Sequence, residues 1–133
     1  MPETNIRNKA RAVLDALGSP EAELSIVIVN DPQIAELNQL YLDRQGPTNV
    51  IAFPLQQGEF TEFAGQMLGD VVISVDTALR ESETAGLDFQ QRFDQLLIHG
   101  ILHLFGYDHV TNADDARLMD EKSKQLLALI SNL

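Results

Sequence analysis

Residues 99–109 read HGILHLFGYDH and contain all three histidines of this 133-residue chain, at positions 99, 103 and 109. His99 and His103 are four residues apart, so on a helix they share one face, about 6 Å apart along the axis. Two such imidazoles can bind one metal ion at about 2.0–2.1 Å each. Gly106 can adopt the left-handed conformation that ends a helix and turns the chain, which would bring His109 to the same ion. The spacing therefore predicts a catalytic type of metal site, with three neutral imidazoles and one open position.

The same spacing occurs in the metzincin zinc proteases, whose motif is HExxHxxGxxH. Gly100 stands where those enzymes carry the glutamate that acts as general base. The sequence thus predicts the metal site without the protease base. Two other interpretations stay open. One is a chance coincidence of spacing, and the other is a structural zinc, which would need a fourth ligand for which Asp108 is the nearby candidate.

The helix that carries the motif is expected to begin at Asp88, and it is apolar nearly all round from Leu96 to Phe105, which is typical of a buried helix. Burying imidazoles without partners costs free energy, and a metal removes that objection. Glycine in a helix interior costs about 1 kcal/mol relative to alanine. Gly100 therefore indicates either the close approach of another element or room above the metal.

Outward from this helix, the pattern predicts three strands. Residues 24–29 form a β-branched run that predicts a well-buried strand. Residues 50–53 are expected to form a short strand that Pro54 ends, which suits a sheet edge. Residues 69–74 are the third strand, and residues 55–67 between them are expected to form a mobile loop or a loose hairpin.

Helix signals flank these strands. The expected helices are residues 5–17; one capped by Asp31 with an apolar stripe at Ile34, Leu37 and Tyr41; one capped by Ser74 or Asp76 with Val75, Ala78, Leu79 and Ser82 on one face; and one capped by Asn112 with Leu118, Met119, Leu126, Leu127 and Ile130 on one face. We expect one α+β domain, 1–133, with a small central mixed sheet flanked by about five helices. The metal site would lie on the penultimate helix and the loop after it.

The composition limits the classes of function. The chain has no cysteine, so disulfides and thiolate metal sites are excluded. No apolar stretch approaches the roughly 18 residues of a membrane span and no signal pattern is present, so a cytoplasmic protein is expected. The net charge of −11 argues against broad electrostatic binding of nucleic acid. The basic residues, namely Arg7, Lys9 and Arg11 near the start and the scattered Arg44, Arg80 and Arg92, are expected to be solvated surface charges.

Three sequence blocks together resemble the YbeY family. Residues 99–109 are similar to its signature HGxLHLxGYDH. Residues 47–54, PTNVIAFP, resemble its motif PT[DN]VL[SA]FP, and residues 68–74, LGDVVIS, resemble LGDIxIS. The blocks occur in the family's order, and the resemblance covers most of the chain from Ser25 onward.

This resemblance implies a single-strand-specific endoribonuclease that acts in ribosomal RNA processing, notably at the 3′ end of small-subunit RNA, and in ribosome quality control. It implies one Zn²⁺ per chain, held by His99, His103 and His109. The implied partners are RNA and the ribosome or ribosomal proteins, with no role at a membrane.

The resemblance also points to further site residues. Leu42 stands where family members commonly carry an arginine that is important for activity, and Arg44 is the candidate to take over that role. Thr48 and Asn49 either position the substrate or cap a turn. A phosphate-binding arginine would stabilise the charge that develops on the phosphoryl oxygens.

A general base must come from outside the helix, because position 100 is glycine. Asp70 and Asp108 are the candidates, and either could instead orient a metal-bound imidazole, which is the role we favour for both. Two rival functions remain at this point: a zinc hydrolase acting on peptides or esters, which Gly100 argues against, and a ribosome-assembly factor that uses a structural zinc and does not cut RNA.

Overall fold

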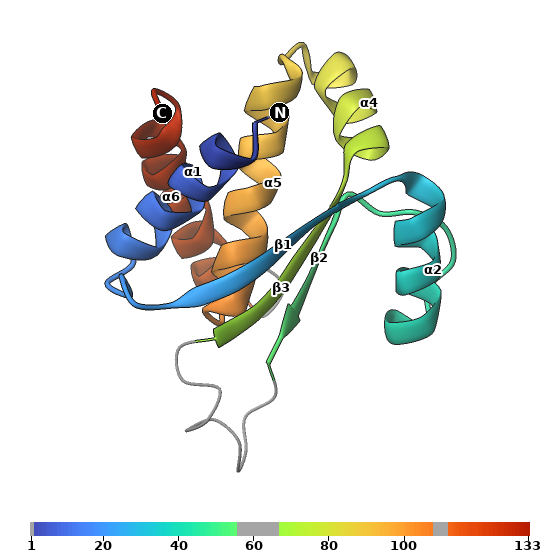
Figure 1. Cartoon of the computed structure of the whole chain (residues 1–133), viewed down its shortest axis with the longest axis horizontal. Coiled ribbons are helices and arrows are strands. Elements are labelled where there is room, and N and C mark those ends of the chain that lie inside the picture. Colours follow the sequence, from blue (N-terminus) through green and yellow to red (C-terminus); the bar gives the residue numbers. More distant parts are fainter. Residues whose placement is uncertain (1, 56–66, 108–111) are drawn as a thin grey trace.

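The computed structural model describes residues 2–55, 67–107 and 112–133, and these form a three-stranded mixed sheet with five helices (Figure 1). The predicted α+β architecture is therefore confirmed. The prediction for residues 55–67 falls mostly outside the described residues. In chain order the elements are α1 (Glu3–Ala16), β1 (Glu23–Val29), α2 (Asp31–Leu42), β2 (Val50–Pro54), β3 (Met67–Ser74), α4 (Val75–Ala85), α5 (Phe89–Leu104) and α6 (Ala113–Ile130).

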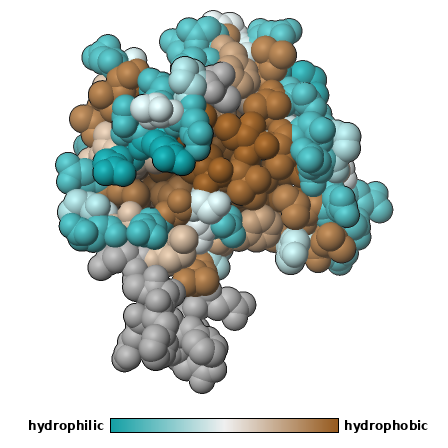
Figure 2. All heavy atoms as spheres, in the orientation of Figure 1, coloured by the Kyte–Doolittle hydropathy of each residue, from teal (hydrophilic) through white to brown (hydrophobic). Residues whose placement is uncertain are grey.

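The last of the three strands lies in the middle of the sheet. The strand order is β1-β3-β2, with β1 parallel and β2 antiparallel to β3. The edge position that Pro54 suggested for β2 is therefore confirmed. The prediction that residues 24–29 are well buried is wrong, because β1 is also an edge strand, and Val27 and Ile28 are 39% and 41% exposed. Figure 2 shows hydrophobic side chains gathered over this part of the sheet.

Helices cover the two faces of the sheet unequally. Figure 1 shows α1, α5 and α6 together on one side and α2 on the other. Val71 and Ile73 of β3 are buried in the larger core, against the first group of helices. Val72, which points to the opposite face, is buried with Ile51 and with Ile34 of α2 in a smaller cluster. This alternation assigns each residue of β3 to one face.

Helix α5 packs directly on the sheet. The helix begins where predicted, with Asp88 as its N-cap in a capping box with Gln91. A Cβ atom at Gly100 would lie 2.5 Å from Cγ1 of Val71 and 3.3 Å from Cγ2 of Val50. The first interpretation of Gly100, the close approach of another element, is therefore confirmed.

Two predictions about α2 are wrong, namely its N-cap residue and the place of Tyr41 on its apolar face. Its N-cap is Asn30, in a capping box with Gln33, and Asp31 is instead the first helical residue. The Asp31 carboxylate accepts hydrogen bonds from hydroxyls that begin α4, so tertiary contacts determine its role. Tyr41 is 66% exposed and contacts Phe53 edge-on, with ring centroids 5.4 Å apart, so it does not belong to a buried stripe.

The caps of the later helices match the patterns more closely. Of the two candidates for the cap of α4, Ser74 is the one that accepts the Thr77 N–H. Asn112 caps α6 as predicted. The predicted apolar faces are too wide, because Leu79 and Leu118 are 47% and 56% exposed.

Two of the basic residues expected to be solvated surface charges, Lys9 and Arg92, are instead largely withdrawn from solvent and paired with carboxylates. Lys9 is 3% exposed, and its Nζ donates to Oδ1 and Oδ2 of the buried Asp94 at 3.1 and 2.8 Å. This pair joins α1 to α5. Arg92 pairs with Glu81 across α5 and α4. No helix among the described residues is long and apolar enough to cross a membrane.

Candidate metal centre and active site

The imidazoles of His99 and His103 converge on one point. Helix α5 places them one turn apart, and their Nε2 atoms lie 3.0 Å from each other. The ring centroids are 4.5 Å apart with an angle of 70° between the planes. Both side chains are half-buried. Two ring nitrogens that face the same spot are a suitable donor set for a metal ion such as zinc.

The third predicted ligand, His109, lies outside the described residues, as does Asp108. Among the residues that the structure does describe, no group of three or more histidine, cysteine, aspartate or glutamate side chains could hold a metal. The described part of the site therefore contributes two imidazoles, those of His99 and His103.

A hollow of about 590 Å³ opens beside these imidazoles, along β2, and we call it the histidine pocket. It brings Arg44, Thr48 and Asn49 together with His99 and His103, although these residues belong to the α2–β2 loop and to α5. Its full lining is Leu42, Arg44, Thr48, Asn49, Val50, Ile51, Ala52, Pro54, His99, Gly100 and His103. The pocket is therefore lined by a guanidinium, a hydroxyl, an amide and two imidazoles.

The loop that carries Arg44 is anchored by the buried Asn38 of α2. The backbone carbonyl of Asn38 accepts the Arg44 N–H at 3.2 Å, and its side-chain Nδ2 donates to the Gly46 carbonyl at 2.9 Å. Asp43, between them, ends α2 with φ of 53°, a left-handed conformation. These contacts hold the backbone at position 44 while the arginine side chain stays exposed. The sequence analysis does not single out Asn38, because no local pattern distinguishes it from the other polar residues of this helix.

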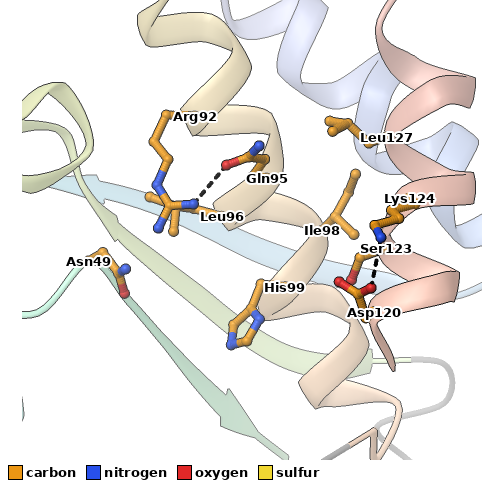
Figure 3. A pocket seen from close by; sticks show the side chains of 10 residues that line it. All are labelled: Asn49, Arg92, Gln95, Leu96, Ile98, His99, Asp120, Ser123, Lys124 and Leu127. Atoms are coloured by element: carbon orange, nitrogen blue, oxygen red, sulfur yellow. Dashed lines mark hydrogen bonds and ion pairs between the residues drawn. The ribbon is translucent and has the colours of Figure 1, made fainter. Parts of the chain in front are cut away.

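Asn49 is held from both ends of its amide. Its Oδ1 accepts the Val50 N–H at 2.7 Å, and its Nδ2 donates to Glu81 of α4 at 3.1 and 3.3 Å. Glu81 in turn accepts from Nε and Nη2 of Arg92, at 3.1 and 3.0 Å. Arg92 Nη1 donates to Gln95 Oε1 at 2.7 Å, which is the dashed contact on α5 in Figure 3. The sequence left open whether Asn49 positions the substrate or caps a turn; in the structure its amide is used to hold the start of β2 against α4.

Glu81, Arg92 and Gln95 were not predicted as parts of the site. Their relation to Asn49 depends on how α4, α5 and β2 pack, and no local spacing signals it. Arg92 was expected to be a solvated charge, and its side chain is only 25% exposed.

The structure does not bring Asp70 to the histidines. Asp70 is exposed and pairs across the sheet with Phe53, which packs against the smaller cluster on the α2 face. Its neighbour Val71 points to the α5 face and contacts Gly100. Side chains of adjacent strand residues point to opposite faces, so Asp70 lies on the face away from His99.

The fold and the pocket define a small α+β protein with an enzyme-like site in which a histidine pair on a buried helix faces an arginine. Residues 1–131 match the family model described as "Endoribonuclease YbeY". The chain belongs to this endoribonuclease family.

Individual relatives agree with the family model. The chain is 45% identical over 128 residues to an endoribonuclease YbeY of Geobacter sulfurreducens, covering 96% of this chain and 85% of the relative. It is 46% identical over 126 residues to that of Geobacter metallireducens, covering 94% and 84%. It is 40% identical over 127 residues to that of Aquifex aeolicus, covering 95% and 82%.

A solved structure shares the fold. The solution structure of a Thermotoga maritima protein matches with a TM-score of 0.69 over 96% of this chain and 79% of that one. The two sequences are 24% identical, so this likeness concerns the fold alone.

Proposed function

We propose that this chain is a zinc-dependent endoribonuclease that cuts single-stranded RNA, ribosomal RNA in particular, at the histidine pocket. The observation that carries the proposal is the convergence of the His99 and His103 Nε2 atoms, 3.0 Å apart, in a pocket that also holds Arg44. Membership of the endoribonuclease YbeY family supplies the reaction class. The ribosome or its proteins are the proposed partners, and the cytoplasm the proposed location.

His99, His103 and His109 would hold the metal, with His109 assigned from its spacing in the sequence. When bound, a zinc ion supplies Lewis acidity toward an attacking oxygen or a phosphoryl oxygen. The donor set fits this ion because neutral imidazole is a common zinc ligand and the two described rings face one spot.

Arg44 would bind and orient the scissile phosphate. A guanidinium offers several N–H donors in a fixed plane, which match two phosphate oxygens. The overall charge of −11 gives no long-range attraction for RNA, so a local cation is needed at the point of cleavage. Thr48, half-buried on the same wall, can donate its hydroxyl to the substrate.

The proton acceptor does not come from α5, since Gly100 occupies the position of the protease base. Asp70 has no direct part in the proposed chemistry, because it lies on the other face of the sheet. Asp108, next to His109, is proposed to orient that imidazole.

The test is cleavage of a 5′-labelled single-stranded RNA by zinc-loaded protein. The parent is compared with a chelated sample, with His103→Ala and with Arg11→Ala, whose arginine is exposed on α1 and does not line the histidine pocket. We expect the parent and Arg11→Ala to cut, and the chelated sample and His103→Ala to be inactive. Equal cleavage by all four samples would reveal a contaminating ribonuclease and remove the support for the proposal.

Metal content and substrate complete the test. Mass spectrometry of the purified protein should find about one zinc per chain, and much less in His103→Ala. A precursor that contains the 3′ end of small-subunit RNA should be cut within its single-stranded part. A folded, zinc-loaded protein that cuts no RNA would overturn the nuclease proposal in favour of an assembly factor.

A further inference from the structure

A second hollow of about 330 Å³ lies on the other side of His99, between the start of β2, the outer face of α5, and α6, and we call it the α5–α6 pocket (Figure 3). It shares two lining residues, Asn49 and His99, with the histidine pocket. The two hollows are therefore neighbours that meet at the candidate metal site. The full lining is Asn49, Arg92, Gln95, Leu96, Ile98, His99, Asp120, Ser123, Lys124 and Leu127.

One stripe of α5 runs through both hollows. Arg92, Gln95, His99 and His103 follow one another at intervals of three or four residues, so they lie along one face of the helix. At 1.5 Å per residue this stripe is about 16 Å long. A ligand bound at the histidines and extending along α5 toward Arg92 would enter the α5–α6 pocket.

The lining of the α5–α6 pocket has the chemistry of a nucleoside site. Leu96, Ile98 and Leu127 give it an apolar part, against which the face of a base can pack. The Ser123 hydroxyl can both donate and accept hydrogen bonds, and the Gln95 amide, whose Oε1 accepts from Arg92, can donate through Nε2, which suits the edges of bases and a ribose hydroxyl.

Lys124 provides a cation at the rim. Its Nζ lies 3.0 Å from Asp120 Oδ2 on the same helix, and the two side chains are 77% and 63% exposed. Such an exposed pair is weak, so the ammonium can turn to a phosphate at little cost. Arg92 is less available, because Glu81 and Gln95 accept hydrogen bonds from its guanidinium.

We propose that the α5–α6 pocket binds the nucleotide adjacent to the cleaved phosphate, with Lys124 contacting the next phosphate of the strand. This inference rests on the proposed function, since it assumes that RNA is cut at the histidine pocket. It accounts for a single-stranded substrate, because a base can enter a pocket only when it is unpaired and unstacked.

The experiment uses two lysines of α6. Lys124→Ala and Lys122→Ala remove the same charge from the same helix, but only Lys124 lines the pocket. We expect Lys124→Ala to raise KM for a short single-stranded RNA about fivefold, and Lys122→Ala to change KM less than twofold. Asp120→Asn, which releases Lys124, should lower KM. Thermal unfolding of each variant checks that the fold is retained.

A modified substrate locates the contact. A neutral methylphosphonate linkage one nucleotide from the mapped cut should raise the KM of the parent for this RNA. It should also abolish the difference in KM between the parent and Lys124→Ala. Equal KM values for the two lysine variants, with cleavage by the parent, would overturn the pocket assignment and leave the proposed function intact.

Binding separates this inference from the proposed function. Fluorescence anisotropy with zinc-loaded protein and a 2′-O-methyl RNA, verified as intact on a gel, gives Kd without cleavage. If the parent cuts no RNA but its Kd depends on Lys124 and not on Lys122, the proposed nuclease function fails, and only the binding of RNA at the α5–α6 pocket is retained, without a cleaved phosphate beside it. Loss of both cleavage and binding would overturn both.

Discussion

Gly100 of α5 lies so close to Val71 of β3 that a Cβ atom on the glycine would come within 2.5 Å of Cγ1 and 3.2 Å of Cγ2 of the valine. Val71 is fully buried, and because its side chain is β-branched it has few rotamers that would move it away from an added Cβ atom. The glycine therefore determines how near the histidine helix lies to the sheet.

Gly100→Ala is expected to lower the free energy of unfolding by about 1 kcal/mol. Overpacking costs about 1–3 kcal/mol, and about 1 kcal/mol is regained from helix propensity. RNA cleavage should fall as well, because α5 carries both described histidines. Urea unfolding and the cleavage assay measure the two effects, and the double variant Gly100→Ala/Val71→Ala should recover cleavage. A single variant more stable than the parent would show that the contact is not tight.

Arg44→Ala is expected to lower kcat/KM for RNA about 10- to 100-fold, because it removes the exposed cation of the histidine pocket. The kcat/KM of Arg44→Lys should lie between those of the parent and Arg44→Ala, since lysine keeps the charge and loses the planar donors. Leu42 lines the same pocket, so Leu42→Arg should restore part of the activity of Arg44→Ala. Steady-state kinetics at fixed salt, with Arg11→Ala as the matched control, measures these effects. Unchanged kcat/KM in Arg44→Ala would remove the arginine from the site.

Lys9→Met is expected to lower the free energy of unfolding by about 3–5 kcal/mol, because it leaves the carboxylate of Asp94 buried without its cation. Gln90 Nε2 still donates to Asp94 Oδ1 at 2.8 Å, but it carries no charge. The double variant Lys9→Met/Asp94→Leu should be close to the parent in stability. Urea unfolding of the four proteins gives the coupling between the two residues. If Lys9→Met lowers the free energy of unfolding by less than about 1 kcal/mol, Lys9 and Asp94 do not form a buried ion pair in solution.

Asp31 predicts a loss of stability in acid. Hydrogen bonds from Ser74 and then Thr77, together with Arg80, lower the pKa of Asp31 from 3.8 to about 2. Because the folded pKa lies below the unfolded one, the contribution of this carboxylate is present above about pH 4 and is lost as the pH falls through 2.

Asp31→Asn should therefore be less stable than the parent at pH 6, on the order of 1 kcal/mol, and the two proteins should converge near pH 2. Thermal unfolding between pH 7 and pH 2 measures the difference. Asp76→Asn is the comparison variant, since Asp76 Oδ2 accepts only the Asp31 N–H among the described contacts. A constant gap between parent and Asp31→Asn over the whole range would show that ionisation of Asp31 is not coupled to folding.

Features that depend on local spacing could be predicted from the sequence. The separation of four residues between His99 and His103 places both imidazoles on one helix face in any fold that keeps the helix. Asp88 and Asn112 cap the helices that follow them, because a cap uses only neighbouring backbone groups. The absence of a side chain at Gly100 indicated either the close approach of another element or room above the metal, and only the structure shows that Val71 is the close neighbour.

Features that depend on the order of the strands could not be predicted in this way. The β-branched run of β1 indicated a strand, but its edge position follows from β3 pairing between β1 and β2. The same order, together with the pleat of β3, turns Val71 toward α5 and Asp70 away from it. A shift of one residue along a strand exchanges its two faces, so composition alone does not assign an aspartate to a site.

Contacts between distant segments were also beyond local patterns. Lys9 meets Asp94 across 85 residues of sequence, and Asn49 meets Glu81 across 32. Each polar pair forms because packed helices bring the two groups to one place, where burial or a shared partner makes the contact favourable. The placement of His99 and His103 on one helix face could thus be predicted from spacing, whereas the surroundings of the two imidazoles depend on how α4, α5 and the edge strand β2 pack together.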